Sequence, residues 1–196
     1  MPDPTGFPPR DDADAKAWFY LEHRRDIEAW AAIQGDASLL LERYFLFLAE
    51  QLEELAEELN AETSSEDLES GPLPRFGLRR RSWNHAVLGD VTVAAGWDRS
   101  NLLRRGNEWP YVGVHVTPDQ EDGERRRRIT DAVSRLRSQP GMHKSYRWPA
   151  WKYVRPRTDA AGVDPEALAR EWCSSFRQLW HDSASALDAL HPESGS

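Results

Sequence analysis

The sequence has little that could support covalent cross-linking or membrane insertion. Its one cysteine, Cys173, excludes an intrachain disulfide and any zinc site built from several thiolates. No run of 18 apolar residues is present, which argues against a transmembrane helix. Residues 1–14 also lack the basic and apolar regions of a secretory signal. We therefore expect a cytoplasmic protein that does not associate with membranes.

Motifs for common catalytic chemistry are missing as well. The sequence contains no G-x-x-x-x-G-K-[ST], no G-x-G-x-x-G and no G-x-S-x-G. No pair of its six histidines has the spacing of a metal site such as H-E-x-x-H. His115 is expected in mid-strand, on the face opposite the valines, and Cys173 is expected to be a buried, inert thiol. We predict no cofactor, no metal site and no catalytic residue, although an enzyme site assembled from scattered residues stays open.

Aromatic residues and charges are abundant. Nine tryptophans, six phenylalanines and five tyrosines are too many for a disordered chain. Much alanine and arginine with little lysine is typical of a high-GC bacterial source. The net charge of −8 is unevenly spread, with −13 on residues 1–74, +9 on residues 75–160 and −4 on residues 161–196. This asymmetry indicates electrostatic partners, or acidic and basic segments that neutralise each other.

The N-terminal part is predicted to be helical after a flexible tail at residues 1–10. Apolar residues recur at helical spacing up to Gly35, a residue type that commonly ends helices. A second helix, with heptad-spaced apolar residues, follows to Asn60. We expect an acidic helical hairpin over residues 11–60. Its candidate self-association residues are Leu41, Phe45, Leu48, Leu52, Leu55 and Leu59.

A polar, acidic stretch that ends in glycine and proline predicts a linker at residues 61–74. Residues 75–191 are expected to form an α+β body, followed by a tail at residues 192–196. Alternating apolar residues predict three strands, and a helix over residues 124–138 follows them. A last extended segment contains Pro149, which favours an edge strand.

The final helix has the clearest start, with Asp164 as N-cap and Pro165 at the first helical position. The predicted fold class is therefore α+β: an N-terminal helical hairpin, then a small, mainly antiparallel sheet (βββαβ) covered by a long C-terminal helix.

The predicted order αβββαβ resembles the core topology of the PD-(D/E)XK nucleases. That resemblance implies a Mg²⁺ site with an acid on the second strand, and an acid and a lysine two residues apart on the third. Asp90 suits the second strand, but the third strand, residues 111–116, contains neither an acid nor a lysine. An active nuclease is therefore not expected, and a degenerate relative that only binds nucleic acid is an alternative.

Basic and aromatic residues alternate in the central part of the chain. Arginine pairs with phosphates and aromatic rings stack on unpaired bases, so this part is a candidate nucleic-acid surface. Consecutive arginines on a helix point in different directions, however, and the tryptophans suit a core equally well. The candidate polyanion-binding residues are Arg79, Arg81, Arg104, Arg105, Arg126, Arg147, Lys152, Trp148 and Trp151.

The interpretation that fits most of these features is a non-enzymatic interaction or regulatory module. It self-associates through the helical hairpin, and its partner is a second copy or another protein, since tryptophan and arginine are enriched at interface hot spots. The alternative is a nucleic-acid-binding accessory domain that uses the face rich in arginine and tryptophan.

Overall fold

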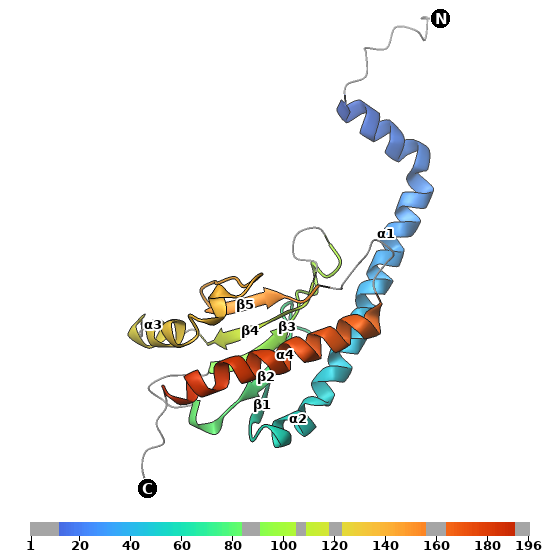
Figure 1. Cartoon of the computed structure of the whole chain (residues 1–196). Helices are drawn as coiled ribbons and strands as arrows, with labels where there is room; N and C mark the ends of the chain where they lie inside the picture. The colour runs from blue at the N-terminus through green and yellow to red at the C-terminus, as the bar shows by residue number, and fades with distance from the viewer. Residues whose placement is uncertain (1–11, 84–90, 105–108, 118–122, 156–163, 191–196) are drawn as a thin grey trace, which may run out of the picture. The chain divides into compact units, whose positions relative to one another are not determined.

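A computed structural model describes residues 12–83, 91–104, 109–117, 123–155 and 164–190 (Figure 1). The chain divides after Leu40 into two compact units, residues 1–40 and 41–196, and each is described by itself. The elements are α1 (Asp12–Glu50), α2 (Leu52–Glu58), β1 (Glu62–Glu66), β2 (Arg75–Arg79), the 3-10 helix η2 (Arg81–Trp83), β3 (Val91–Gly96), β4 (Tyr111–Val116), α3 (Gly123–Ala132), the 3-10 helix η3 (Leu136–Ser138), β5 (Ala150–Tyr153) and α4 (Pro165–Asp188).

The long helix α1 and the short helix α2 lie within residues 11–60, the region of the predicted helical hairpin, and no turn separates two helices at Gly35. Gly35 lies inside α1 and is not among the described residues with a positive φ angle. A glycine ends a helix by adopting the left-handed conformation, so without that conformation the helix continues through Gly35. The non-helical backbone inside α1 is at His23, with φ −109° and ψ 15°.

Replacing Gly35 with alanine is expected to stabilise α1 locally. A Cβ atom built at this position has no neighbouring atom within 4 Å, so the methyl group causes no clash. Alanine is more favourable than glycine in a helix interior by about 1 kcal/mol. Amide hydrogen exchange of residues 30–40 should therefore slow about fivefold in Gly35→Ala. Unchanged or faster exchange would show that Gly35 is not in a helix interior.

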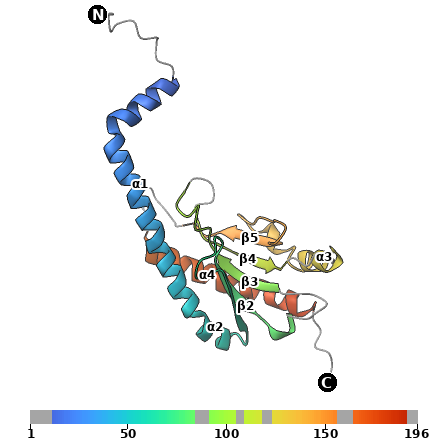
Figure 2. The same cartoon turned by 180° about the vertical axis from the view of Figure 1, so that it is seen from behind.

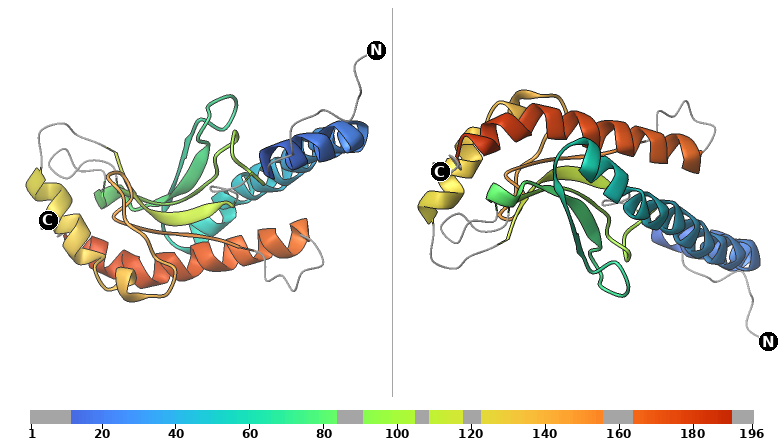
Figure 3. Two further views of the ribbon diagram at one scale, coloured as in Figure 1. Left: turned by 90° about the horizontal axis from the view of Figure 1, so that it is seen from above. Right: turned by 90° about the horizontal axis from the view of Figure 1, so that it is seen from below.

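The second unit is built on a five-stranded antiparallel sheet with the order β1-β2-β3-β4-β5. Helix α4 covers one face of this sheet, in front of it in Figure 1 and behind it in Figure 2; Figure 3 shows α4 running along the sheet. The alternate residues that point to this face are apolar and buried: Phe76, Leu78, Val91, Val93, Ala95, Val112, Val114 and Val116. The predicted α+β class is confirmed, and the valines of β4 lie on the face opposite His115, as expected.

Strand β1 lies in the segment predicted to be a linker, residues 61–74. Its sequence, ETSSE, has no apolar side chain, so it lacks the alternation by which a half-buried strand is recognised. The backbone ladder joins it to β2, and charge pairs across the strands add to this pairing. Glu62 lies opposite Arg79, and Glu66 lies opposite Arg75 and pairs with its guanidinium. Opposite charges in directly facing positions stabilise a strand pair.

The start of α4 and the edge position of β5 agree with the predictions from the sequence. The Asp164 carboxylate accepts hydrogen bonds from Glu166 N at 2.9 Å and Ala167 N at 3.2 Å, and Pro165 begins α4. β5 follows Pro149 and forms an edge of the sheet, as predicted. Helix α3 is shorter than predicted and is followed by η3. None of the helices in the described part of the chain combines the length and the apolar character needed to cross a bilayer.

Candidate functional site

The sheet face opposite α4 has small residues in its centre and aromatic residues on one side. At Gly113 in β4, a Cβ atom would lie 2.5 Å from Trp151 Cβ and 2.8 Å from Trp148 Cε3. The absence of a side chain at Gly113 therefore allows both tryptophans to lie against the strand. The residues in register with Gly113 across the neighbouring strands are Ser64, Gly77, Ala94 and Trp151.

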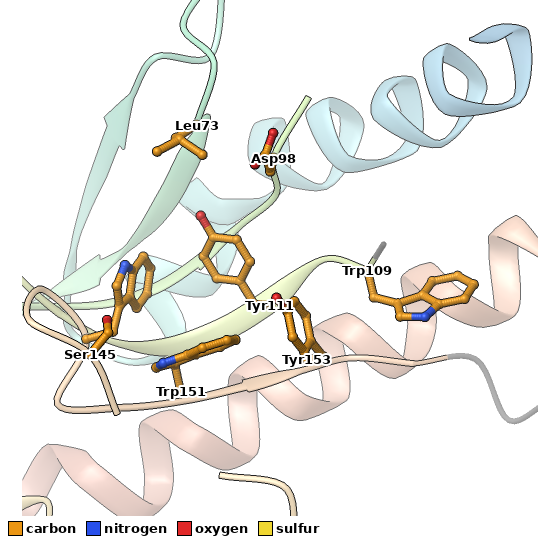
Figure 4. A pocket seen from close by; sticks show the side chains of 8 residues that line it. Leu73, Asp98, Trp109, Tyr111, Ser145, Trp151 and Tyr153 are labelled. Atoms are coloured by element: carbon orange, nitrogen blue, oxygen red, sulfur yellow. The ribbon is translucent and has the colours of Figure 1, made fainter. Parts of the chain in front are cut away.

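A cavity of about 170 Å³ opens beside these tryptophans (Figure 4). It is smaller than the roughly 300–1,000 Å³ of most small-molecule sites, so its size suits a head group or one side chain. Figure 4 shows its lining side chains arriving from the loop before β2, the end of β3, β4 and the β5 region. We call this cavity the aromatic pocket. It is lined by Leu73, Asp98, Trp109, Tyr111, Ser145, Trp148, Trp151 and Tyr153.

The rings of the aromatic pocket pack edge to face. Tyr111 lies with its ring centroid 5.1 Å from that of Trp148 at an interplanar angle of 88°, and 6.0 Å from that of Trp151 at 72°. Trp151 and Tyr153 are 4.9 Å apart at 85°. Such arrangements add about 0.5–1.5 kcal/mol per pair beyond the buried area. The rings are therefore held in fixed orientations relative to one another.

Asp98 places one carboxylate on the lining. Its Oδ1 atom accepts hydrogen bonds from Ser100 N at 2.9 Å and Ser100 Oγ at 2.6 Å, and its Oδ2 atom accepts one from Asn101 Nδ2 at 2.8 Å. Burial alone raises the pKa of Asp98, but these hydrogen bonds outweigh it and the pKa is lowered overall. The carboxylate is therefore ionised at neutral pH. Burial raises the pKa of Tyr111 to about 12, so this phenol stays neutral.

His115 lies in mid-strand on the face opposite the valines, as predicted, and so shares a sheet face with Tyr111. Its side chain is buried, with 3% of its surface exposed. Its ring centroid is 4.8 Å from that of Trp148. Nε2 has no hydrogen-bond partner among the described residues. Burial, followed by the charges of Arg75 and Arg147, lowers the pKa of His115 to about 3. The imidazole is therefore neutral at physiological pH.

The predicted polyanion-binding residues are distributed over several places. Trp148 and Trp151 meet in the aromatic pocket, whereas Lys152 has the opposite orientation along β5. Arg79 and Arg81 both approach Glu62 of β1, with N–O distances of 4.0 and 3.4 Å.

The remaining members of that set lie elsewhere on the surface. The Arg126 guanidinium lies 3.3 Å from the ring centroid of Tyr146. Arg104 and Arg147 are exposed, and Arg105 lies outside the described residues. The structure therefore pairs two of the arginines with an acid and places a third on an aromatic ring.

The six predicted self-association residues lie in the hydrophobic core of the second unit. Leu41, Phe45 and Leu52 are at most 5% exposed, and Phe45 contacts Trp172 with 4.5 Å between ring centroids. The other three, Leu48, Leu55 and Leu59, are partly buried against the same core. This apolar face of the helices is therefore covered within the chain.

The first unit exposes a different set of apolar side chains along α1. Trp30 is 70% exposed, Ile33 62% and Leu40 46%. Together with Ala37 they are spaced 3, 4 and 3 residues apart, which is the spacing of heptad a and d positions. We call Trp30, Ile33, Ala37 and Leu40 the exposed heptad, although Ala37 itself is half-buried. Further large apolar side chains of this unit are also exposed: Trp18, Phe19, Tyr20, Leu21 and Leu39.

Neither the aromatic pocket nor the exposed heptad brings together groups for metal or thiol chemistry. Within the described residues no cluster of three or more histidine, cysteine, aspartate or glutamate side chains could hold a metal ion. Cys173 is half-buried on α4, and burial raises the pKa of its thiol, which disfavours the reactive thiolate. Comparisons of this chain with protein-family models, with curated proteins and with solved structures each found no match.

Proposed function

We propose that this protein is a non-enzymatic interaction module that self-associates through the exposed heptad of α1. The observation that carries the proposal is the exposure of Trp30, Ile33 and Leu40 at the spacing of a helical seam. Helices in proteins gain most of their stability from packing of an apolar face. An uncovered apolar face of this kind marks an interaction surface.

The charge around the exposed heptad favours a second copy as the partner. Residues 29–41, AWAAIQGDASLLL, contain one charged residue, Asp36. Two such stretches can therefore lie against each other with little electrostatic repulsion. With Asp36 as its one charged residue, the same stretch offers little by which a strongly acidic or basic partner would be attracted.

The test compares neighbouring leucines in the oligomeric state of the full chain. Sedimentation should show a dimer for the wild type. Leu40→Ala should weaken the dimer about tenfold, and Trp30→Ala about thirtyfold or more, because tryptophan at the centre of an interface is often a hot spot. Leu39→Ala is the matched control, since Leu39 is 55% exposed but lies outside the heptad positions. A wild-type chain that stays monomeric at all concentrations, or equal effects of Leu39→Ala and Leu40→Ala, would contradict the proposal.

Nucleic-acid binding is a second candidate function, favoured by the surface around Tyr146. This tyrosine is 63% exposed and carries the Arg126 guanidinium on its ring, with exposed Lys144 and Arg147 beside it in sequence. Cations next to an exposed ring are typical of sites for single-stranded nucleic acid.

For this candidate, binding of a single-stranded oligonucleotide should weaken steeply between about 50 and 200 mM salt, because released counterions drive phosphate binding. Arg126→Ala should weaken binding and flatten the salt dependence. Gln178→Ala, a change at an exposed neutral residue of α4, serves as the control. Affinity that ignores salt would rule out a phosphate-driven site.

A further inference from the structure

We propose that the aromatic pocket binds a quaternary ammonium group, of the kind found in choline. This site is independent of the proposed self-association, because it lies in the second unit and shares no residue with the exposed heptad. The proposal rests on three properties of the pocket: the aromatic rings on its walls, the carboxylate of its lining and its size.

The walls supply the interaction that quaternary ammonium groups favour. The face of a tryptophan or tyrosine ring carries negative electrostatic potential, and several such rings around one cavity form the aromatic cage that recognises methylated ammonium ions. Five aromatic side chains line this cavity. Tyr111 lies at its centre, with Trp151 and Tyr153 beside it (Figure 4), and the edge-to-face contacts fix these rings before any ligand arrives.

The charge of the pocket also favours a cation. Asp98 contributes a carboxylate, and none of the eight lining residues is basic. Two arginines lie close by. Arg75 acts electrostatically on Tyr111, but its guanidinium is paired with Glu66. The Arg155 guanidinium, outside the lining set, lies 5.8 Å from the ring centroid of Tyr153, and its charge opposes part of the attraction that Asp98 exerts on a cation.

The size and polarity of the pocket select a methylated ammonium over other cations. A volume of about 170 Å³ accommodates a compact head group but not a whole cofactor. A lysine ammonium is strongly hydrated and would lose its water shell in a cavity walled mainly by rings. A quaternary ammonium has no N–H group to satisfy, so it enters the same cavity at a lower desolvation cost.

The first experiment compares a cation with its neutral counterpart on the full wild-type chain. Choline chloride and 3,3-dimethylbutanol have nearly the same shape, and only choline is charged. Titration at constant ionic strength, followed by the indole N–H signals in NMR spectra, should show choline binding at least about tenfold more tightly. Equal affinities would mean that the pocket is a general apolar cavity and would overturn the proposal.

The second experiment removes the charge of the pocket with little change in its shape. Asp98→Asn should weaken choline binding about tenfold and leave 3,3-dimethylbutanol unaffected. Tyr146→Leu, a change at an exposed ring that does not line the pocket, should alter neither affinity. Unchanged choline binding in a folded Asp98→Asn protein would contradict the role of the carboxylate. If the variant fails to fold, the comparison of the two ligands on the wild type decides alone.

A third titration identifies the source of the ammonium group. A short peptide that contains trimethyllysine should bind more tightly than choline if the natural ligand is a modified protein, and more weakly if it is a free head group. Both results retain the quaternary ammonium as the recognised group. Failure of both probes to shift any indole N–H signal would overturn the proposal.

Discussion

Trp172→Ala is expected to remove about 3–5 kcal/mol from the free energy of unfolding of the second unit, the range measured for deletion of large buried aromatic side chains. Trp172 is 1% exposed and lies at the centre of the core. Its ring centroid is 4.5 Å from that of Phe45, 5.2 Å from that of Phe76 and 6.0 Å from that of Trp97. Residues from the N-terminal helix, the sheet and α4 therefore lose contacts together.

Urea denaturation followed by circular dichroism measures this loss. Small domains are stable by about 5–15 kcal/mol, so this loss is a large share of the total. The urea concentration at the unfolding midpoint should fall in proportion. Trp172→Phe should cost less, since it keeps a ring but loses the hydrogen bond from Nε1 to Tyr111 O, at 3.3 Å. Phe47→Ala is the control, because that side chain is 57% exposed and belongs to neither the core nor the exposed heptad. A loss below about 1 kcal/mol for Trp172→Ala would show that neighbouring side chains repack into the space left by the indole ring.

The second large effect is a pH dependence of stability that arises from His115. Its pKa is lowered by burial from 6.5 to about 3 in the folded protein, whereas the unfolded chain keeps the ordinary value. Between these two values the unfolded state binds the proton and the folded state does not. The stability from neutral His115 is therefore complete above about pH 6.5 and falls by up to about 1.4 kcal/mol per pH unit below it.

Urea titrations at about pH 7 and pH 4.5 should reveal this dependence by comparison with His115→Gln. At the lower pH the wild type should lose about 2–3 kcal/mol more than the variant, which has no imidazole to protonate. The comparison is needed because carboxylates also titrate in this range. His181→Gln, a change at an exposed histidine of α4, should follow the wild type. Parallel profiles for wild type and His115→Gln would contradict a buried, neutral His115.

The sequence predicted the second unit better than the first. Alternation of apolar residues identified the covered face of β3 and β4, and the Asp-Pro pair identified the start of α4. Strand β1 was missed because cross-strand charge pairs, rather than buried side chains, hold it in place. Apolar periodicity carries no information about a strand of this kind.

The error at Gly35 had consequences for the candidate interface. Because glycine commonly ends helices, the sequence predicts a helix end there, which places Trp30, Ile33, Ala37 and Leu40 on two helices and not on one seam. It also points to the leucines after Gly35 for association, although these belong to the core or pack against it. Heptad spacing shows that a face is apolar, but the tertiary structure decides whether the face is covered within the chain or by a partner.

The aromatic pocket was only partly visible in the sequence. The sequence points to Trp148 and Trp151, for which a core position and a stacking role both stay open. It gives no sign of Asp98 or Tyr111, because Tyr111 reaches the tryptophans only through strand register and Asp98 lies in the loop after β3. Tyr111 lies opposite Gly96 on one side and Tyr153 on the other. Such neighbours are far apart in the chain, and pairing of strands is a property of the folded sheet.

The polar composition of β1 also determines where copies of this protein do not meet. An edge strand presents unpaired N–H and C=O groups, to which another chain can add by strand pairing, and such addition leads to open-ended aggregates. β1 has glutamates at both ends and serine and threonine between them, so addition of another strand would take charged and polar side chains out of water. Growth of fibrils from this edge is thereby disfavoured, and two molecules that collide remain free to associate through their helices.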